Sequence, residues 1–358
     1  MLVAMSGGVD SSVAAMLLCR QGYEVGGCTM LLCADRRPGR DGDFHASAAV
    51  DDARRVAERL GIRHQVFDFR DIFRETVTEP FVDAYLRGET PNPCVLCNRD
   101  VKFGALLRRA LELGFDHLAT GHYARIARNE ENGLFELRRS AATEKDQTYA
   151  FYTLTQEQLS HVLFPVGEMA KTQVRALAAE LLPHVAEKPD SQEICFVQGE
   201  SYAVFIERQG HAPPPGDFVD TDGAILGRHR GIHRYTVGQR KGLGAFGRPL
   251  YVTGIRADKD EVVLGENADA FASSADVDNL NWIIPPPGAE FAAEVKVRYN
   301  ARAVPCAVRI SRNGSSRILF TSPERAVTPG QAAVFYRGDV VLGGGTIRRG
   351  ARTGISRP

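Results

Sequence analysis

Hydrophobic residues in the first half of the chain alternate between short continuous runs and helical spacing. The runs are typical of buried strands, and the segments between them place apolar residues every three or four positions, as amphipathic helices do. In Ala48–Leu60, for example, Ala49, Ala53 and Val56 share one face, and Gly61 follows as a stop signal. Such alternation predicts an α/β fold with a doubly wound, mainly parallel sheet and helices on both faces. The predicted strands are Leu2–Met5, Glu24–Leu31, His64–Phe69 and His117–Gly121, and the predicted helices are Ser12–Arg20, Ala48–Leu60, Asp71–Leu86 and one capped by Asn98 that ends before Gly114.

The pattern changes after Cys195. Pro213–Gly216 and the glycine-rich stretch Thr236–Gly247 interrupt helical spacing, which predicts a small central α+β domain over residues 200–275. Beyond Pro285–Gly288, short β-rich runs alternate with turn residues and predict a C-terminal β-barrel over residues 276–358. The α/β domain would then occupy residues 1–199.

The composition is typical of a globular protein of the cytoplasm. Of the 358 residues, 44% are hydrophobic and 25% are charged, and no apolar run reaches membrane-spanning length. The N-terminus reads as a strand rather than a secretory signal. The seven cysteines, an odd number, indicate reactive or metal-binding thiols rather than a disulfide framework.

The formal net charge is zero, but the charge is unevenly distributed. From Asp276 onward there are 12 Lys and Arg against 6 Asp and Glu, a net charge of +6, so the remaining 32 against 38 give −6. The basic C-terminal part is therefore a candidate surface for a polyanion, although chance unevenness explains the charge alone equally well.

Ser6–Ser11, with the sequence Ser-Gly-Gly-Val-Asp-Ser, lies between the first predicted strand and the first predicted helix. Gly7 and Gly8 let backbone amides approach an anion, and the helix dipole favours negative charge at this position. The serine hydroxyls add donors, and Asp10 can hold a cation against phosphates. The segment resembles the pyrophosphate-binding loop of the N-type ATP pyrophosphatase superfamily, whose members cleave ATP to AMP and pyrophosphate.

Two further motifs contain cysteine. In Thr90–Asn98 the prolines predict an extended loop, and Cys97 would lie at a helix N-terminus, where the dipole lowers a thiol pKa. Cys94 and Cys97 form a Cys-x-x-Cys pair, typical of a redox pair or half a zinc site, but no second pair follows. Cys195 lies between Ile194 and Phe196, which favours a buried inert thiol, whereas Lys188, Asp190 and Ser191 upstream suit a phosphate-binding environment. Cys19 and Cys306 are predicted core residues, Cys28 lies in a strand, and Cys33 has no clear partner.

Taken together, these motifs resemble the tRNA-specific 2-thiouridylase family over essentially the whole chain. The family thiolates the wobble uridine of certain tRNAs and has the adenine nucleotide α-hydrolase-like form of the α/β fold. The segments that carry the resemblance are Ser6–Ser11, Thr90–Asn98 with Lys102-Phe103, Ala119–Tyr123, Lys145–Gln147, Leu163–Glu168, Asp190–Phe196, Gly238–Gly244, Arg298-Tyr299, Thr328–Tyr336 and Leu342–Gly345.

The resemblance implies a role for each matching residue. Cys97 and Cys195 would be the catalytic pair, with a persulfide on Cys195 and Cys97 as partner nucleophile, ending as a Cys97–Cys195 disulfide. ATP, with Mg²⁺, would bind Ala4, Met5, Ser6, Gly7, Gly8, Val9, Asp10, Ser11, Met30 and Gly121. The target base would contact Asn92, Pro93 and Cys94, and the anticodon arm of the tRNA would contact His122, Lys145, Asp146, Gln147, Arg298, Tyr299 and Gln331.

The chain departs from the family pattern at two places. Many members have Asp where this chain has Cys94, and three thiolates from Cys94, Cys97 and Cys195 would suit a [4Fe–4S] cluster that delivers sulfide. Two routes for the sulfur atom are therefore left open. One is a persulfide relay that a sulfur-donor protein loads, and the other is a cluster that delivers sulfide. The loop Leu31–His45, rich in Arg and Asp, matches no family pattern.

The hypothesis is ATP-dependent thiolation, in which AMP is transferred to the C2 oxygen of uracil and sulfur then displaces it. The main alternative is a small-molecule ligase or amidotransferase of the same superfamily, which would need Ser6–Ser11 but neither Cys97 nor Cys195. A redox or iron–sulfur module built on Cys94 and Cys97 ranks last, because it leaves the phosphate-binding loop unexplained.

Overall fold

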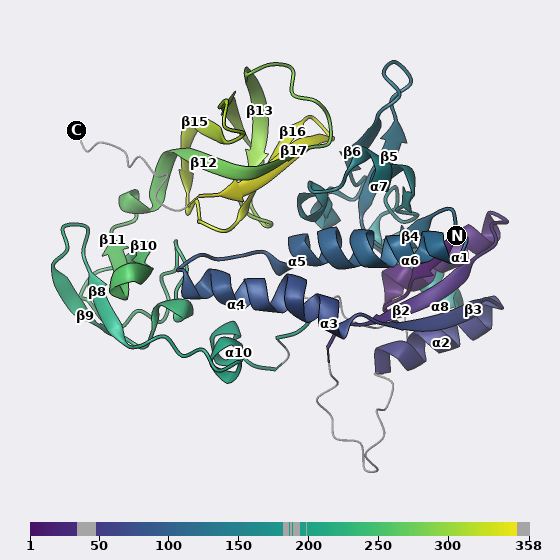
Figure 1. Cartoon of the computed structure of the whole chain (residues 1–358), viewed down its shortest axis with the longest axis horizontal. Helices are drawn as coiled ribbons and strands as arrows, with labels where there is room; N and C mark the ends of the chain where they lie inside the picture. The colour runs from purple at the N-terminus through teal and green to yellow at the C-terminus, as the bar shows by residue number, and fades with distance from the viewer. Residues whose placement is uncertain (34–47, 182–185, 187, 189–193, 198, 349–358) are drawn as a thin grey trace, which may run out of the picture. The chain divides into compact units, whose positions relative to one another are not determined.

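The chain forms two compact units, and each is described by itself. A computed structural model describes residues 1–33, 48–181, 186, 188, 194–197 and 199–348 (Figure 1). Unit 1 contains Met1–Val77, Cys94–Phe196 and Asp339–Val341, and unit 2 contains Thr78–Pro93, Val197–Gly338 and the chain from Leu342. The predictions for most of the loop Leu31–His45, for Asp190 and Ser191, and for the last three arginines fall outside the described residues.

Unit 1 is built on a five-stranded sheet in the order β3-β2-β1-β4-β7, in which every neighbouring pair is parallel. Strand β1 lies in the middle and is completely buried at Val3, as expected of a strand covered on both faces. The predicted α/β class with a parallel sheet is confirmed. The strands are β1 (Leu2–Ala4), β2 (Gly26–Leu31), β3 (Arg63–Asp68), β4 (Leu118–Thr120) and β7 (Val162–Leu163).

Helices α1 (Val9–Arg20) and α2 (Ala48–Leu60) connect β1 to β2 and β2 to β3, and a longer helical segment leads back to β4. Because parallel crossovers are right-handed, α1 and α2 cover one face of the sheet, and the part of the returning segment that belongs to unit 1 covers the other. The strand order reverses between β1 and β4, and such a reversal is where open α/β sheets bind ligands. The returning segment contains α3 (Arg70–Phe73), a π-helix (Arg74–Thr78), α4 (Glu79–Leu86), α5 (Pro93–Leu96), a second π-helix (Cys97–Leu106) and α6 (Leu107–Glu112), of which α4 belongs to unit 2.

Beyond β4, unit 1 adds a hairpin and short helices. In this hairpin Arg125 donates to Asp339, which lies 2.9 Å away and belongs to the same unit. The elements are β5 (Ala124–Arg128), β6 (Phe135–Arg139), 3₁₀ turns at Thr143–Lys145 and Thr148–Phe151, α7 (Gln156–Ser160) and α8 (Lys171–Leu181).

Unit 2 contains a four-stranded sheet in the order β10-β11-β8-β9, together with helices α4 and α10 (Tyr202–Arg208). The rings of Tyr85 on α4 and Tyr202 on α10 stack with their centroids 4.7 Å apart. The strands are β8 (Gly216–Val219), β9 (Ile225–His229), β10 (Tyr251–Arg256) and β11 (Glu261–Gly265), with 3₁₀ turns at Ile232–Arg234, Ala257–Lys259 and Ala268–Ala270.

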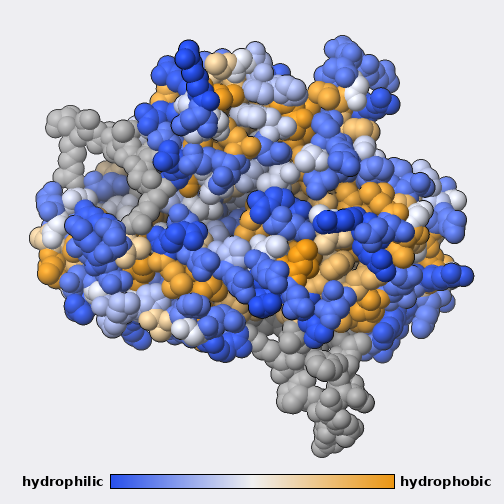
Figure 2. Space-filling view, in the orientation of Figure 1, coloured by the Kyte–Doolittle hydropathy of each residue, from blue (hydrophilic) through white to orange (hydrophobic). Residues whose placement is uncertain are grey.

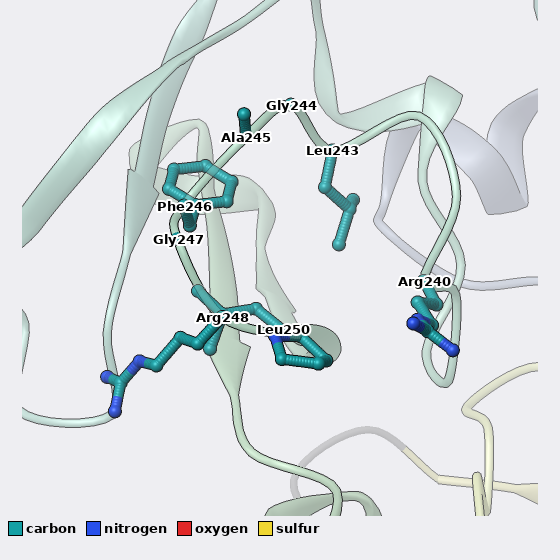
Figure 3. Close-up of a pocket in the computed structure, with 9 residues that line it drawn as sticks. Arg240, Leu243, Gly244, Ala245, Phe246, Gly247, Arg248 and Leu250 are labelled. Carbon is teal, nitrogen blue, oxygen red and sulfur yellow. The ribbon is translucent and has the colours of Figure 1, made fainter.

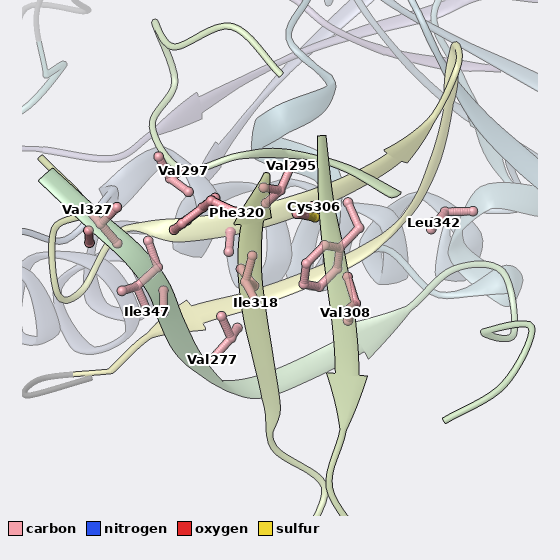
Figure 4. Close-up of a cluster of buried hydrophobic side chains, with 14 residues drawn as sticks. Val277, Val295, Val297, Cys306, Val308, Ile318, Phe320, Val327, Leu342 and Ile347 are labelled. Atoms are coloured by element: carbon pink, nitrogen blue, oxygen red, sulfur yellow. The ribbon is translucent and has the colours of Figure 1, made fainter. Parts of the chain in front are cut away.

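The remainder of unit 2 is a six-stranded antiparallel barrel, closed by the pairing of its first strand with its last. Its core contains Val277, Val308, Ile318 and Phe320, all of them buried (Figure 4). This core confirms the predicted C-terminal β-barrel. The strands are β12 (Phe271–Trp282), β13 (Glu290–Lys296), β14 (Val304–Ile310), β15 (Ser316–Arg325), β16 (Ala332–Arg337) and β17 (Val340–Ile347).

The glycine-rich loop of unit 2 surrounds a shallow recess. Arg240, Leu243 and the stretch 244–250 line it, with the Arg240 and Arg248 side chains on opposite sides (Figure 3). Arg248 forms an ion pair with Glu266 at 2.9 Å. The recess contains none of the residues predicted to act in catalysis or ATP binding.

No helix in the described part of the chain is long and apolar enough to cross a membrane. Hydrophilic residues cover much of the face shown in Figure 2, and hydrophobic ones lie among them in small groups.

Candidate active site

The segment Ser6–Ser11 forms a tight connection between β1 and α1, as its glycines predict. Helix α1 begins at Val9, earlier than the predicted Ser12, so Asp10 and Ser11 lie in its first turn. Gly7 has φ +68°, and a Cβ there would lie 2.4 Å from the Ala49 carbonyl oxygen. Only glycine fits this position without strain, and the loop backbone is therefore held close to α2.

Hydroxyl groups fold the loop onto itself. The Ser6 amide donates to Ser11 Oγ at 3.2 Å, and Ser12 Oγ donates to the Gly8 carbonyl at 2.8 Å. Ser6 is exposed and Gly8 is half-buried, so the loop combines ordered donors with access from solvent. This is the arrangement that binds phosphate at a helix N-terminus.

The carboxylate of Asp10 already holds a cation. Lys171 Nζ, at the start of α8, donates to both carboxylate oxygens at 2.7 and 2.8 Å, and the Tyr123 hydroxyl donates to one of them at 2.8 Å. This ion pair does not test the prediction that Asp10 holds a cation against phosphates, and the sequence does not identify Lys171, which lies 161 residues further along. Nothing in the sequence marks Lys171 as the partner of Asp10, because lysines are common in helices.

A second lysine, Lys188, is hydrogen-bonded to the backbone of the loop. Lys188 Nζ donates to the Gly7 carbonyl oxygen at 2.6 Å and to the Asp52 carboxylate on α2. The suggestion that Lys188 contributes to a phosphate-binding environment therefore agrees with its position. Two ammonium groups thus contact the loop.

Gly121, at the end of β4, lies directly against the loop. A Cβ on Gly121 would be 2.4 Å from the Ser11 amide nitrogen and 2.5 Å from the Asp10 carbonyl carbon. Ala4 ends β1, Met5 follows it, and Met30 lies near the end of β2, the strand next to β1. The structure therefore brings the predicted ATP-binding residues together at the point where the strand order reverses.

Cys97 lies within a helix and not at its N-terminus, which corrects the sequence-based prediction. Pro93 begins the helix, because its missing N–H and restricted φ suit a first helical turn. Asn98 consequently does not cap the helix: it is buried, and its Nδ2 donates to the Ala150 carbonyl at 3.2 Å. Cys97 is only 7% exposed, and burial raises its thiol pKa, where the sequence predicted a lowered one.

Cys195 reaches solvent, so the prediction that it is buried is also wrong, whereas its reactivity stays a prediction. Surrounding protein nevertheless raises its pKa to about 12, first by burial and then through Cys97, Cys33 and Cys94. These three thiols act on Cys195 electrostatically and so lie near it. Cys33 is the residue that sequence reasoning missed, because nothing links it to a position 162 residues away.

Two of the other cysteines match their predicted positions: Cys306 lies in the barrel core, and Cys28 is buried in β2. Cys19 is only partly buried on α1, so the prediction that it is a core residue is wrong. All seven cysteines lie in the described residues and are thiols.

The chain matches known families along its length. Residues 1–199 match the tRNA methyl transferase HUP domain, residues 204–266 the tRNA methyl transferase PRC-barrel domain and residues 273–347 the aminomethyltransferase beta-barrel domain. The tRNA-specific 2-thiouridylase MnmA of Acetivibrio thermocellus is 49% identical over 353 residues, which cover 97% of this chain and 98% of that protein. The protein of the same name from Lachnoclostridium phytofermentans is 51% identical over 354 residues, with 97% and 98% coverage.

The chain belongs to the tRNA-specific 2-thiouridylase family. The family resemblance inferred from the motifs is thus confirmed. The roles of individual residues stay predictions.

The residues with which this family would contact tRNA are divided between the two units. In unit 1, Asp146 accepts from Thr148 Oγ1 at 2.9 Å, and Gln147 Oε1 accepts from the Tyr123 amide at 2.8 Å. These two residues therefore shape the loop that presents Lys145. His122 lies among aromatic rings next to Gly121.

In unit 2, Asn92 and Pro93 follow a segment that is hydrogen-bonded to the barrel. The Thr90 amide donates to the Pro329 carbonyl at 2.8 Å, and Gln331 Nε2 donates to the Thr90 carbonyl at 2.7 Å. Tyr299 is 39% exposed, and Arg298 lies 3.7 Å from Glu324. Unit 2 thus joins the predicted base-contacting segment to one of the predicted tRNA contacts, Gln331.

The cysteines do not form a ready metal site. Among the described residues, which include Cys94, Cys97 and Cys195, no three His, Cys, Asp or Glu side chains are placed to hold a metal ion. The donor set of a [4Fe–4S] cluster is therefore not assembled among these residues.

Replacing Lys171 by Met is expected to destabilise unit 1 and weaken ATP binding. The Asp10 side chain is 31% exposed and would keep its charge without its cation. Breaking a partly buried pair on one side costs about 1–2 kcal/mol, less than for a fully buried pair because water still reaches the carboxylate. Thermal unfolding with and without Mg-ATP measures both effects.

The matched control is the double variant Lys171→Met/Asp10→Asn, which removes the uncompensated charge. It should recover most of the lost stability while ATP still fails to raise the unfolding temperature. A Lys171→Met protein with wild-type stability and a wild-type ATP shift would contradict this account.

Proposed function

We propose that this protein replaces the C2 oxygen of the wobble uridine of tRNA with sulfur, at the expense of ATP. The family membership supports the overall reaction. The observation that carries the mechanism is a chain of contacts within unit 1. Gly121 touches the phosphate-binding loop, and its neighbour His122 lies 3.1 Å from Lys102 on the helix that contains Cys97. These contacts support a mechanism in which the phosphate and sulfur chemistry take place at one site.

The first step would activate the base. The C2 oxygen attacks the α-phosphorus of ATP, pyrophosphate leaves along Ser6–Ser11, and AMP remains on the oxygen. The loop amides, Lys171 and Lys188 stabilise the departing negative charge. Both oxygens of Asp10 already accept hydrogen bonds from Lys171, so a Mg²⁺ ion that accompanies ATP would neutralise charge on the phosphates and would reach Asp10 only in place of that ion pair.

The second step would transfer sulfur. The terminal sulfur of a Cys195 persulfide, loaded by a sulfur-donor protein, attacks C2, and AMP leaves with the former C2 oxygen. The Cys97 thiolate then attacks the Cys195 sulfur, which breaks the persulfide S–S bond and leaves a thiocarbonyl on the base. The pair ends as a Cys97–Cys195 disulfide, which a thiol reductant restores.

A single assay tests the reaction as a whole. Purified protein, unmodified tRNA, Mg-ATP and a persulfide donor should give 2-thiouridine in the digested tRNA, with one AMP and one pyrophosphate for each sulfur incorporated. Nucleoside mass spectrometry and labelled ATP measure these products. Cleavage of ATP to ADP, or AMP formation that ignores tRNA and follows a small carboxylate instead, would favour the ligase alternative.

A further inference from the structure

The helix that contains Cys97 has an unusual winding. Cys97–Leu106 is a π-helix, in which hydrogen bonds join residues five apart. In an α-helix, a residue five positions along points about 140° away from the first. In a π-helix the turn closes near the fifth residue, so Lys102 lies over Cys97 on the same side. The sequence shows the spacing of these two residues but not this winding.

The ammonium group of Lys102 is held in place by a neutral histidine. Lys102 Nζ lies 3.1 Å from His122 Nε2, and His122 Nδ1 lies 2.7 Å from Thr120 Oγ1. Because an ammonium group only donates, Nε2 must be unprotonated, and the ring proton is then on Nδ1, where it donates to Thr120. Thr120 is buried at the end of β4 and gives the ring a rigid support.

The surroundings keep the imidazole neutral. The rings of Phe151, Phe164 and Phe103 lie 5.0, 6.2 and 6.3 Å from His122 between centroids. Burial, and then the charge of Lys102, hold the pKa of His122 well below its usual value of 6.5. At neutral pH the histidine is therefore an acceptor for Lys102 and does not compete with its positive charge.

The two catalytic thiols need such a charge. Burial raises the pKa of Cys97, and Cys94 and Asp100 raise it further, while Lys102 lowers it. Asp100 is paired with Arg99, whose guanidinium lies 2.8 Å away. At Cys195, burial and the thiols of Cys97, Cys33 and Cys94 raise the pKa, and Lys102 again opposes them. The same lysine thus favours the thiolate form of both sulfurs.

We propose that Lys102, held by the His122–Thr120 pair, is a positioning residue whose positive charge opposes the effect of burial and favours the thiolate form of Cys97 during sulfur transfer. The role of Lys102 in sulfur transfer rests on the proposed function. The effect of its charge on the Cys97 thiol does not, because it arises within the protein without tRNA or ATP. It assigns to His122 a task inside the site, in addition to the contact with tRNA that the family resemblance implies.

The test measures the reactivity of Cys97 without tRNA or ATP. The full-length protein is alkylated with iodoacetamide at pH values from 6 to 10, and mass spectrometry of the Cys97 peptide gives the rate at each pH. Lys102→Gln keeps a donor for His122 and removes the charge. It should move the midpoint of the profile upward and slow alkylation at neutral pH by about tenfold, the effect of one pKa unit. Lys102→Arg should stay near the wild-type profile.

Lys259→Met, an exposed lysine in unit 2, controls for loss of a positive charge elsewhere. Unchanged profiles in both Lys102→Gln and Lys102→Met would overturn the proposal. Single-turnover thiolation adds a second readout: the defect of Lys102→Gln should shrink as the pH rises, whereas damage to the fold would not. If the protein does not thiolate tRNA at all, the proposed function fails, and the alkylation profiles still decide the role of Lys102.

Discussion

Cys195→Ser is expected to abolish sulfur incorporation while ATP is still cleaved in the presence of tRNA. A hydroxyl cannot carry a sulfane sulfur, so thiolation should fall by at least about 10⁴-fold, the scale seen when a covalent nucleophile is lost. Adenylation should persist, because the loop Ser6–Ser11 and its lysines Lys171 and Lys188 are untouched. Quantification of 2-thiouridine and AMP from the same reaction separates the two steps.

Cys97→Ser should also stop turnover, but at a later stage. A persulfide should still form on Cys195, and the sulfur should stay on the protein because the partner nucleophile is missing. Mass spectrometry of the Cys195 peptide detects the added sulfur. Cys19→Ser is the matched control and should thiolate normally, because Cys19 is a partly buried residue near the end of α1.

The outcome that contradicts this mechanism is thiolation at a normal rate by Cys195→Ser. Sulfur would then have to reach the base by another route. Cys33, whose thiol lies within electrostatic reach of Cys195, would be the next residue to replace.

The fold was largely predictable because strand and helix patterns have different periods. The sheet of unit 1 and the barrel of unit 2 both follow from apolar spacing, and the helix Ala48–Leu60 has its predicted bounds. The helix at Pro93 was harder to predict, because the prolines of Thr90–Asn98 are equally typical of an extended loop. It continues as a π-helix, in which Asn98 donates to the Ala150 carbonyl and Phe103 packs against Phe151, and local sequence does not reveal these contacts.

The active site was predictable where a single segment carries the chemistry. Ser6–Ser11 shows its glycines and hydroxyls together, so a phosphate-binding role could be predicted from this segment alone. Lys171 and Cys33 come from distant segments and reach the site only through tertiary structure. The pKa of Cys97 was mispredicted for the same reason, since burial, which opposes any helix dipole, depends on the whole unit.

Gly121→Ala is expected to disable ATP binding without unfolding the protein. The new methyl group would lie 2.4 Å from the Ser11 amide and 2.5 Å from the Asp10 carbonyl carbon, both backbone atoms that a rotamer change cannot move. Ordinary contact requires β4 and the first turn of α1 to separate by about 1 Å, and a misplacement of that size can lower catalysis about 10²-fold. The overpacking itself costs about 1–3 kcal/mol.

Three measurements on Gly121→Ala distinguish a displaced loop from general damage. The rate of tRNA-dependent pyrophosphate release should fall about 10²-fold, and Mg-ATP should no longer raise the unfolding temperature, while circular dichroism stays native. Gly254→Ala is the matched control, because its methyl group would meet Val263 at 3.8 Å, an ordinary contact in β10 of unit 2. Wild-type pyrophosphate release by Gly121→Ala would show that the contact between β4 and the phosphate-binding loop does not position ATP. The loop alone would then have to hold the nucleotide. The contacts that run from Gly121 through His122 to the helix of Cys97 would no longer support a single site for ATP and sulfur chemistry.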